Sequence, residues 1–271
     1  MSEIKQLPGG VWREERLYRD FAFREVSGHL ELALAETSGV CHDLPGRVSH
    51  ALHTALSQLA EKKPSLSQVD DLSVGDRQFL MSRLACHLGG GEVWFSAECG
   101  HCQSHFDFPV DYCTIPVKQA GAGYPYADLE LSGGRTRLRV PSGADQRAVL
   151  EYDDDREAQH ALVSRCLEFY HQSGQAWTLS EQDVAKIDQT LETMAPELAT
   201  QASANCPECE GVNLLAIDPY VCLGQVSDNL FVEIHQLAAQ YHWSETEILG
   251  LPRWRRKKYL ALIDRARGMS Q

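Results

Sequence analysis

Two pairs of cysteines have the spacing of metal ligands. Within each pair the thiols stand at positions i and i+3, and an alternating apolar stretch follows that is typical of a short strand. Thiolates at this spacing on a tight turn present two sulfur atoms to one ion, and a tetrahedral Zn²⁺ site needs four ligands. We therefore predict one shared structural zinc ion, which brings the segments near 95–113 and 204–218 together. The four ligands are Cys99, Cys102, Cys206 and Cys209.

Three other uses of these cysteines compete with structural zinc. Disulfides are disfavoured because the N-terminal residues lack an apolar signal segment and the cysteines number nine, so we expect a reducing cytoplasm. Redox catalysis is suggested by the tetrapeptide Cys99-Gly-His-Cys102, the one that protein disulfide isomerases use, but Pro109 prevents the long helix that this chemistry needs. Metal-free buried thiols are the third alternative. We interpret the remaining thiols as small core residues: Cys41, Cys86, Cys113, Cys166 and Cys222.

The sequence offers no catalytic constellation. Four sulfur ligands complete a zinc shell and leave no position for water or substrate, although His101 or His105 would be able to replace one of them. Nucleophile-elbow, phosphate-loop and His-Glu-x-x-His motifs do not occur. The run 153–155 of three aspartates is typical of a solvated helix start. We therefore expect a protein that is not an enzyme and has no small-molecule substrate.

Charge is distributed unevenly along the 271 residues. The formal net charge is −13, which disfavours general nucleic-acid binding, yet residues 251–271 carry seven cations and one acid. This basic tail suits an acidic partner or the acidic surface of the chain itself. The predicted partner-binding residues are Trp243, Trp254, Arg253, Arg255, Arg256, Lys257 and Lys258.

Hydrophobic periodicity predicts an α+β fold: a zinc-ribbon-like pair of knuckles with β-hairpins, a helical insertion between the knuckles and a helical C-terminal tail. A strand is expected at 21–26 and a hairpin at 129–140. Helices are expected at 27–35, 48–59, 77–88, 146–152, 157–173, 181–194 and 229–241, followed by a capped turn at 244–251 and a basic helix. The predicted domains are 1–92 with a strand and helices, 93–219 with the knuckles and the insertion 114–203, and 220–271 as the tail.

Several phrases of the sequence resemble one known family. They include FREVSGHLE at 23–31, LSVGDRQFL at 72–80, VPSGADQ at 140–146, both knuckles, and tail phrases at 234–238, 241–249 and 251–253. Together they are similar to the T-even-phage-type baseplate hub assembly chaperones and their relatives in contractile injection systems. The resemblance implies a structural or assembly role among other baseplate or tail proteins, in the cytoplasm of the host bacterium and without catalytic residues.

Two other functional classes stay open. A zinc-ribbon regulator would bind nucleic acid through the basic tail, and its affinity would fall steeply with salt. A thiol-disulfide oxidoreductase would use Cys99 and Cys102. The chain also departs from many knuckles at Glu98 and Gln103, which flank the first pair without removing a ligand. The role is therefore open between a transient chaperone and a component that the finished particle retains.

Overall fold

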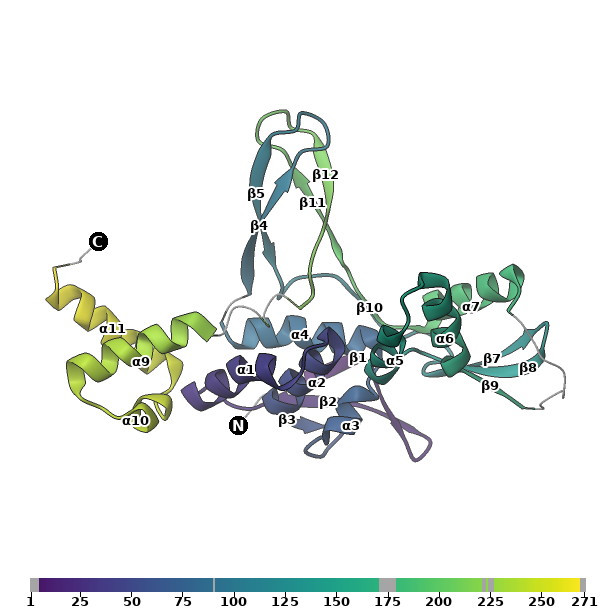
Figure 1. Ribbon diagram of the computed structural model, residues 1–271, viewed down its shortest axis with the longest axis horizontal. Coiled ribbons are helices and arrows are strands. Elements are labelled where there is room, and N and C mark those ends of the chain that lie inside the picture. Colours follow the sequence, from purple (N-terminus) through teal and green to yellow (C-terminus); the bar gives the residue numbers. More distant parts are fainter. Residues whose placement is uncertain (1–4, 90, 171–178, 221–222, 224–226, 269–271) are drawn as a thin grey trace.

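The structure is a computed structural model that describes residues 5–89, 91–170, 179–220, 223 and 227–268. A central body carries three extensions, and each extends in a different direction (Figure 1). One is an arm of two long β-hairpins, one is a lobe of helices and a small sheet, and one is a C-terminal group of helices. Helices and small antiparallel sheets occur together, which confirms the predicted α+β class.

The body consists of a three-stranded antiparallel sheet and four helices. The sheet has the order β1–β2–β3, and apolar side chains such as Phe21, Leu52, Leu80 and Met81 are fully buried. This burial supplies the main stabilisation of the body. The strands are β1 (Lys5–Arg13), β2 (Arg16–Phe23) and β3 (Leu56–Leu59), and the helices are α1 (Gly28–Val40), α2 (Leu44–Ala55), α3 (Leu66–Asp70) and α4 (Val74–His87).

Serine caps fix the beginnings of several helices. Ser73 accepts a hydrogen bond from the Asp76 backbone N–H at the start of α4, and Ser180 forms a capping box with Asp183 at the start of α7 (Glu181–Met194). The predicted helices at 77–88 and 181–194 are confirmed with shifts of at most a few residues. The helices predicted at 27–35 and 229–241 are confirmed as α1 and α9 (Ser227–Tyr241).

Two predicted helices are too long. The stretch 48–59 ends as helix α2 at Ala55, and its last residues form β3, which pairs with β2 through Phe21 and Leu59. The stretch 157–173 likewise divides into α6 (Asp155–Cys166) and β9 (Leu167–Phe169), and residues 171–173 lie outside the described residues. The prediction of a helix is wrong at the C-terminal end of each of these two stretches. A few apolar residues fit either the helical or the strand period, and pairing with a neighbouring strand decides which one forms. Strand β1 was not predicted.

The insertion lobe contains a three-stranded sheet and helices around a core of its own. Leu138, Ile187 and Met194 are buried there. The predicted hairpin is confirmed as β7 and β8, with β9 beside β8, and the predicted helix at 146–152 is a short helix followed by a 3-10 turn. A short pair of strands closes the base of the lobe. The elements not yet bounded are β6 (Val117–Lys118), β7 (Tyr126–Leu131), β8 (Gly134–Arg139), α5 (Gly143–Ala148), η1 (Val149–Glu151) and β10 (Glu197–Leu198).

The C-terminal unit consists of α9, α10 (Glu245–Leu249) and α11 (Arg253–Ala266), packed around Leu237, Ile248 and Ile263. It packs closely against α1 at Gly28, which has no side chain. A Cβ atom at this position would lie only 2.7 Å from the Leu249 Cα. None of the described helices combines the length and the apolar character that crossing a membrane requires. The domain boundaries at 92 and 219 stay a prediction.

Candidate metal centre

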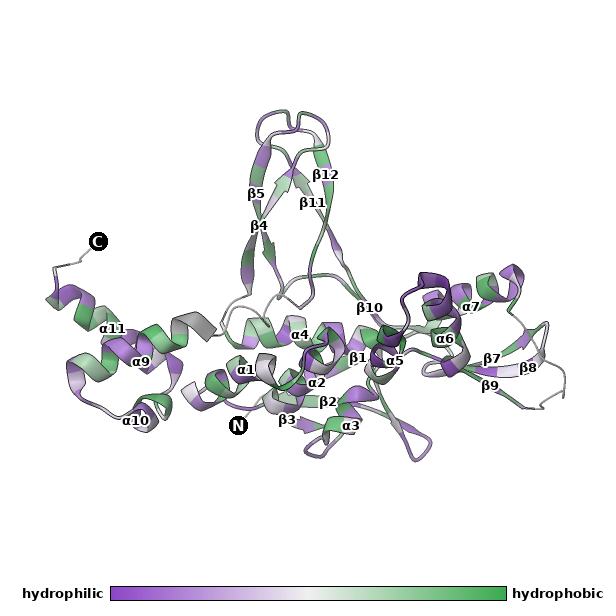
Figure 2. Ribbon diagram, in the orientation of Figure 1, coloured by the Kyte–Doolittle hydropathy of each residue, from purple (hydrophilic) through white to green (hydrophobic). Residues whose placement is uncertain are grey.

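Two hairpins form the arm, and each knuckle is the turn of one hairpin. The first hairpin is β4 (Glu92–Glu98) and β5 (His105–Asp111), and the second is β11 (Gln201–Asn205) and β12 (Val212–Ala216). Hydrophilic and apolar bands alternate along the arm (Figure 2), as half-buried strands require. The inner side chains Phe106, Phe108 and Val110 belong to the same buried cluster as the core of the body. The arm thus extends that core outward to the cysteines at its tip (Figure 1).

The two knuckles have the same backbone geometry. The N–H of Gln103 donates to the Cys99 carbonyl at 2.9 Å, and the N–H of Glu210 donates to the Cys206 carbonyl at 2.9 Å. Gln103 and Glu210 both lie in the left-handed region, with φ of 64° and 59°. This turn places the second cysteine of each pair beside the first. The two Cys-x-x-Cys segments, which have the same spacing in the sequence, therefore also form the same turn in the structure.

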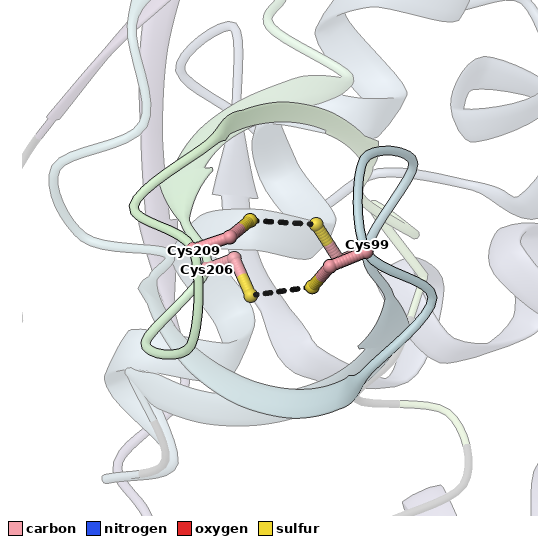
Figure 3. Close-up of side chains that lie close together, drawn as sticks. Cys99, Cys206 and Cys209 are labelled. Atoms are coloured by element: carbon pink, nitrogen blue, oxygen red, sulfur yellow. Dashed lines mark hydrogen bonds between the residues drawn. The ribbon is translucent and has the colours of Figure 1, made fainter.

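The four thiols lie together at the tip. Their sulfur atoms all lie within 4.8 Å of one another, and the Cys99–Cys209 and Cys102–Cys206 sulfur pairs are each 3.7 Å apart (Figure 3). A regular ZnS₄ tetrahedron with bonds of about 2.3 Å has sulfur–sulfur edges of about 3.8 Å. The donor set and its dimensions fit a tetrahedral metal ion. The predicted approach of the two cysteine pairs is confirmed.

Hydrogen bonds orient the Cys99 sulfur. The His101 backbone N–H lies 3.4 Å from this sulfur and the Asn213 side-chain amide lies 3.6 Å from it. Asn213 also links the knuckles, because its carbonyl oxygen accepts a 2.9 Å hydrogen bond from the Gly100 N–H. Such contacts hold ligands in position around a metal. Asn213 was not predicted to support the site, although a polar residue at an inward position of an apolar strand was a usable signal.

The four thiols differ in acidity. Hydrogen bonds from the Cys102 and His101 backbone lower the pKa of the Cys99 thiol to about 6. For Cys209 the Gly211 N–H acts in the same direction, but the contact with Cys102, burial and the contact with Cys99 outweigh it and raise the pKa to about 12. Four thiols in so small a volume do not all ionise unless a cation compensates the charge. The cluster therefore suits a cation that binds four thiolates.

Neither histidine of the first knuckle belongs to this cluster. The His101 ring nitrogen Nε2 lies 3.2 Å from the Val212 carbonyl oxygen in the second hairpin. His105 pairs with Glu98 in the β4–β5 register and is exposed. In the described part of the chain the group of possible metal ligands consists of the four cysteines.

The other cysteines have mixed roles. Cys86 and Cys113 form a disulfide between the end of α4 and the segment after β5, so the expectation that the sequence disfavours disulfides is wrong for this pair. Cys86 packs partly buried against the main core as predicted, whereas Cys113 is exposed and is not a core residue. Their 27-residue separation and the lack of a repeated pattern hid this pairing from sequence reasoning. Cys166 is buried as predicted, Cys41 is half-buried and contacts Asp43, and Cys222 lies outside the described residues.

The predicted contact residues of the tail separate into two groups. Trp243 stacks on Tyr241 with ring centroids 4.8 Å apart, and Arg256 is buried between Glu31 and Glu233. The remaining residues lie at or near the surface of α11. Arg253 pairs with Glu31 and Lys257 with Glu233, whereas Trp254, Arg255 and Lys258 are exposed.

Fold and site define an α+β protein with a knuckle pair whose four cysteines could hold a metal ion. The family model of the T4 bacteriophage base plate protein matches residues 18–217. The chain belongs to this family, and the resemblance noted in its sequence is confirmed at that level. Membership indicates a structural or assembly role in a phage and contact with other tail or baseplate proteins. No curated protein and no solved structure gives a match.

Proposed function

We propose that this chain is a non-enzymatic assembly protein, a baseplate assembly chaperone, of a contractile phage tail or a derived injection system. It acts in the cytoplasm of the host bacterium. One Zn²⁺ ion bound by Cys99, Cys102, Cys206 and Cys209 stabilises it. The zinc is a structural cross-link between segments that are far apart in the chain, and its closed sulfur shell leaves no open position for a reaction.

The observation that carries this proposal is the position of the cysteine cluster at the tip of the arm (Figure 1). An isolated two-stranded hairpin is marginally stable in water, and here two of them stand side by side. A metal ion at the tip fastens both turns at once and fixes the register of the inner faces. The arm then presents a rigid surface to a partner, as an assembly protein requires.

The outer surface of α11 is the proposed contact for another tail protein. Trp254 is 67% exposed, and Arg255 and Lys258 lie beside it on the exposed side of the helix. Exposed tryptophan together with arginine is typical of residues that dominate binding energy at interfaces. Arg256 and Trp243, by contrast, support the helix from within.

Co-expression with baseplate and tail proteins of the same phage or injection system tests the function. We expect a stable complex with at least one of them in size-exclusion chromatography, and we expect Trp254→Ser with Lys258→Glu to weaken it. Lys62→Glu is the control with the same change in net charge, because Lys62 is exposed on the body. Tight binding of duplex or single-stranded DNA at physiological salt, or thiol-disulfide exchange that survives chelation and is lost in Cys99→Ser, would contradict the proposal.

A further inference from the structure

The outer face of the first hairpin of the arm is acidic. Side chains that point away from the second hairpin alternate along β4 and β5, and they include carboxylates but no lysine or arginine. Trp94 lies in the middle of this face, opposite Pro109, and is 62% exposed. We call this surface the acidic arm face; its residues are Glu92, Trp94, Ser96, Glu98, His105, Asp107, Pro109 and Asp111.

The acidity of this face is local and is not explained by the fold. Glu92 and Asp111 stand directly opposite each other in the register, and like charges at such positions are destabilising. The second hairpin has the same architecture, yet its outward residues carry no charge: Gln201, Ser203, Asn205, Val212, Leu214 and Ala216. A zinc arm therefore does not need outward carboxylates. Their position on one hairpin indicates a surface for a cationic partner.

Helix α11 presents a surface of the opposite charge. Trp254, Lys258 and Leu262 follow one another at i, i+4 and i+8, and Arg265 continues the same exposed stripe. Leu262 is 46% exposed. Within the described residues, no carboxylate pairs with Arg255, Lys258, Arg265 or Arg267, whereas the other cations of the helix are paired with Glu31 and Glu233. We call this surface the basic helix face; its residues are Trp254, Arg255, Lys258, Leu262 and Arg265.

The two faces match in length as well as in charge. A strand of seven residues, such as β4, spans about 20 Å, and a helix of fourteen residues, such as α11, also spans about 20 Å. Each face has one exposed tryptophan near charged side chains. Arm and C-terminal unit extend from the body in different directions (Figure 1), so one chain does not bring its own two faces together.

From this complementarity we propose that the basic helix face of one copy docks on the acidic arm face of a second copy. This inference rests on the proposed assembly function and adds a second copy of the chain to the tail proteins that the outer surface of α11 would contact. The contact is head to tail, so a pair of chains keeps one free face of each kind, and successive copies form a ring or a filament. Because one helix on one hairpin is a small interface, we expect association to depend on concentration and to weaken as salt rises.

Sedimentation velocity of the full, zinc-loaded chain tests the contact. We expect wild-type protein to form oligomers at low salt and to dissociate in about 0.5 M salt, where charges are screened within a few ångströms. Arg255→Glu with Lys258→Glu blocks the helix face, and Glu92→Lys with Glu98→Lys blocks the arm face. Each is expected to weaken association at least about tenfold. Zinc content and circular dichroism identify any variant that fails to fold.

Matched controls carry the same change in charge elsewhere. Lys62→Glu with Lys63→Glu changes the body, and Glu151→Lys with Asp153→Lys changes the insertion lobe, at exposed positions. Both controls should associate like wild type. Association lost equally in them would show that net charge, and not these faces, governs the oligomer.

Mixing the two blocked variants gives the decisive result. Each variant alone has two faces of like charge and should stay monomeric. In the mixture the native faces pair with each other and the altered faces pair through their exchanged charges, so association should return. A chain with all four substitutions should regain association in the same way. A wild-type chain that stays monomeric at every salt concentration, or a mixture that stays monomeric, overturns the inference. Either result would leave the proposed function standing if a tail protein still binds.

Discussion

The arm and the C-terminal unit are both joined to the body, but different chemistry holds them. The arm shares the main hydrophobic core, and at its tip four thiols meet. The C-terminal unit has its own small core and meets α1 through the buried Arg256, whose partners are Glu31 and Glu233. The contrast teaches that a narrow arm with little interior places four possible metal ligands at its tip, whereas a helical unit with its own core is joined by an oriented clamp.

Loss of the cysteine site should have the largest effect. Cys206→Ser removes one of the four thiols of the proposed zinc site. Structural zinc supplies about 10 kcal/mol or more in small zinc-finger peptides, so the tip of the arm should open. Hydrogen exchange should rise sharply over 92–111 and 201–216 while the C-terminal unit keeps its protection. The control Cys41→Ser lies outside the cluster and should leave both regions unchanged. Equal protection of the arm in both variants would count against a metal-held tip.

Removal of the clamp should have the next largest effect and act on the other region. Arg256→Ala removes the buried cation between two buried carboxylates, which keep only the more exposed Arg253 and Lys257 as partners. Breaking a buried pair costs about 3–5 kcal/mol. We expect hydrogen exchange to rise in α9–α11 while the arm stays protected. Arg255→Ala, one residue away and exposed, should change stability by less than about 0.5 kcal/mol. Similar losses in the two variants would show that Arg256 is no clamp.

Acid should weaken a third region, the insertion lobe, where Asp145 pairs with Arg139 and Arg165. Burial acts to raise the pKa of Asp145, but hydrogen bonds from Arg139 and Ser142 outweigh it and lower the pKa from 3.8 to about 2. The folded value lies below the unfolded one, so this stabilisation is present above about pH 4 and is lost as the pH falls towards 2. It amounts to at most about 2.5 kcal/mol, because one pKa unit corresponds to about 1.4 kcal/mol.

The comparison of Asp145→Asn with Asp153→Asn isolates this contribution, because Asp153 is exposed. Denaturant unfolding at several pH values should show a flatter acid limb for Asp145→Asn alone. Identical acid limbs in wild type and Asp145→Asn would assign the acid sensitivity to other groups.

The smallest expected effect concerns Asn213. Its amide contacts the Cys99 sulfur and its carbonyl oxygen accepts from Gly100, so Asn213→Ala removes support from an intact set of ligands. Metal affinity should fall about tenfold, at the lower end of the usual range for such supporting residues, without loss of the fold. Competition with a chromophoric chelator measures this change. An unchanged affinity would limit Asn213 to packing.

Sequence reasoning succeeded where the signal is local. The Ser180 cap and the spacing of the apolar residues that follow it located α7 to the residue, and i, i+3 cysteines located both knuckles. These features follow from backbone geometry within a few residues. The joining of the two cysteine pairs was also within reach, because a tetrahedral ion needs four ligands.

The missed features depend on distant partners. Leu56–Leu59 and Leu167–Phe169 are strands because β2 and β8 lie beside them, and nothing in their own residues separates a strand from a continued helix. In the sequence Arg256 resembles every other cation of the basic tail. Its partner Glu31 is 225 residues away, so nothing near Arg256 in the sequence indicates their pairing. Its burial follows from how the C-terminal unit packs on α1, which charge patterning alone does not contain.

The most direct test of a metal-held arm is the metal content of the purified chain, combined with X-ray absorption at the zinc edge. We predict one zinc per chain with four sulfur neighbours at about 2.3 Å, and its loss in Cys99→Ser and Cys206→Ser alike. A folded chain without metal, or zinc bound through nitrogen from His101 or His105, would contradict the four-thiolate site.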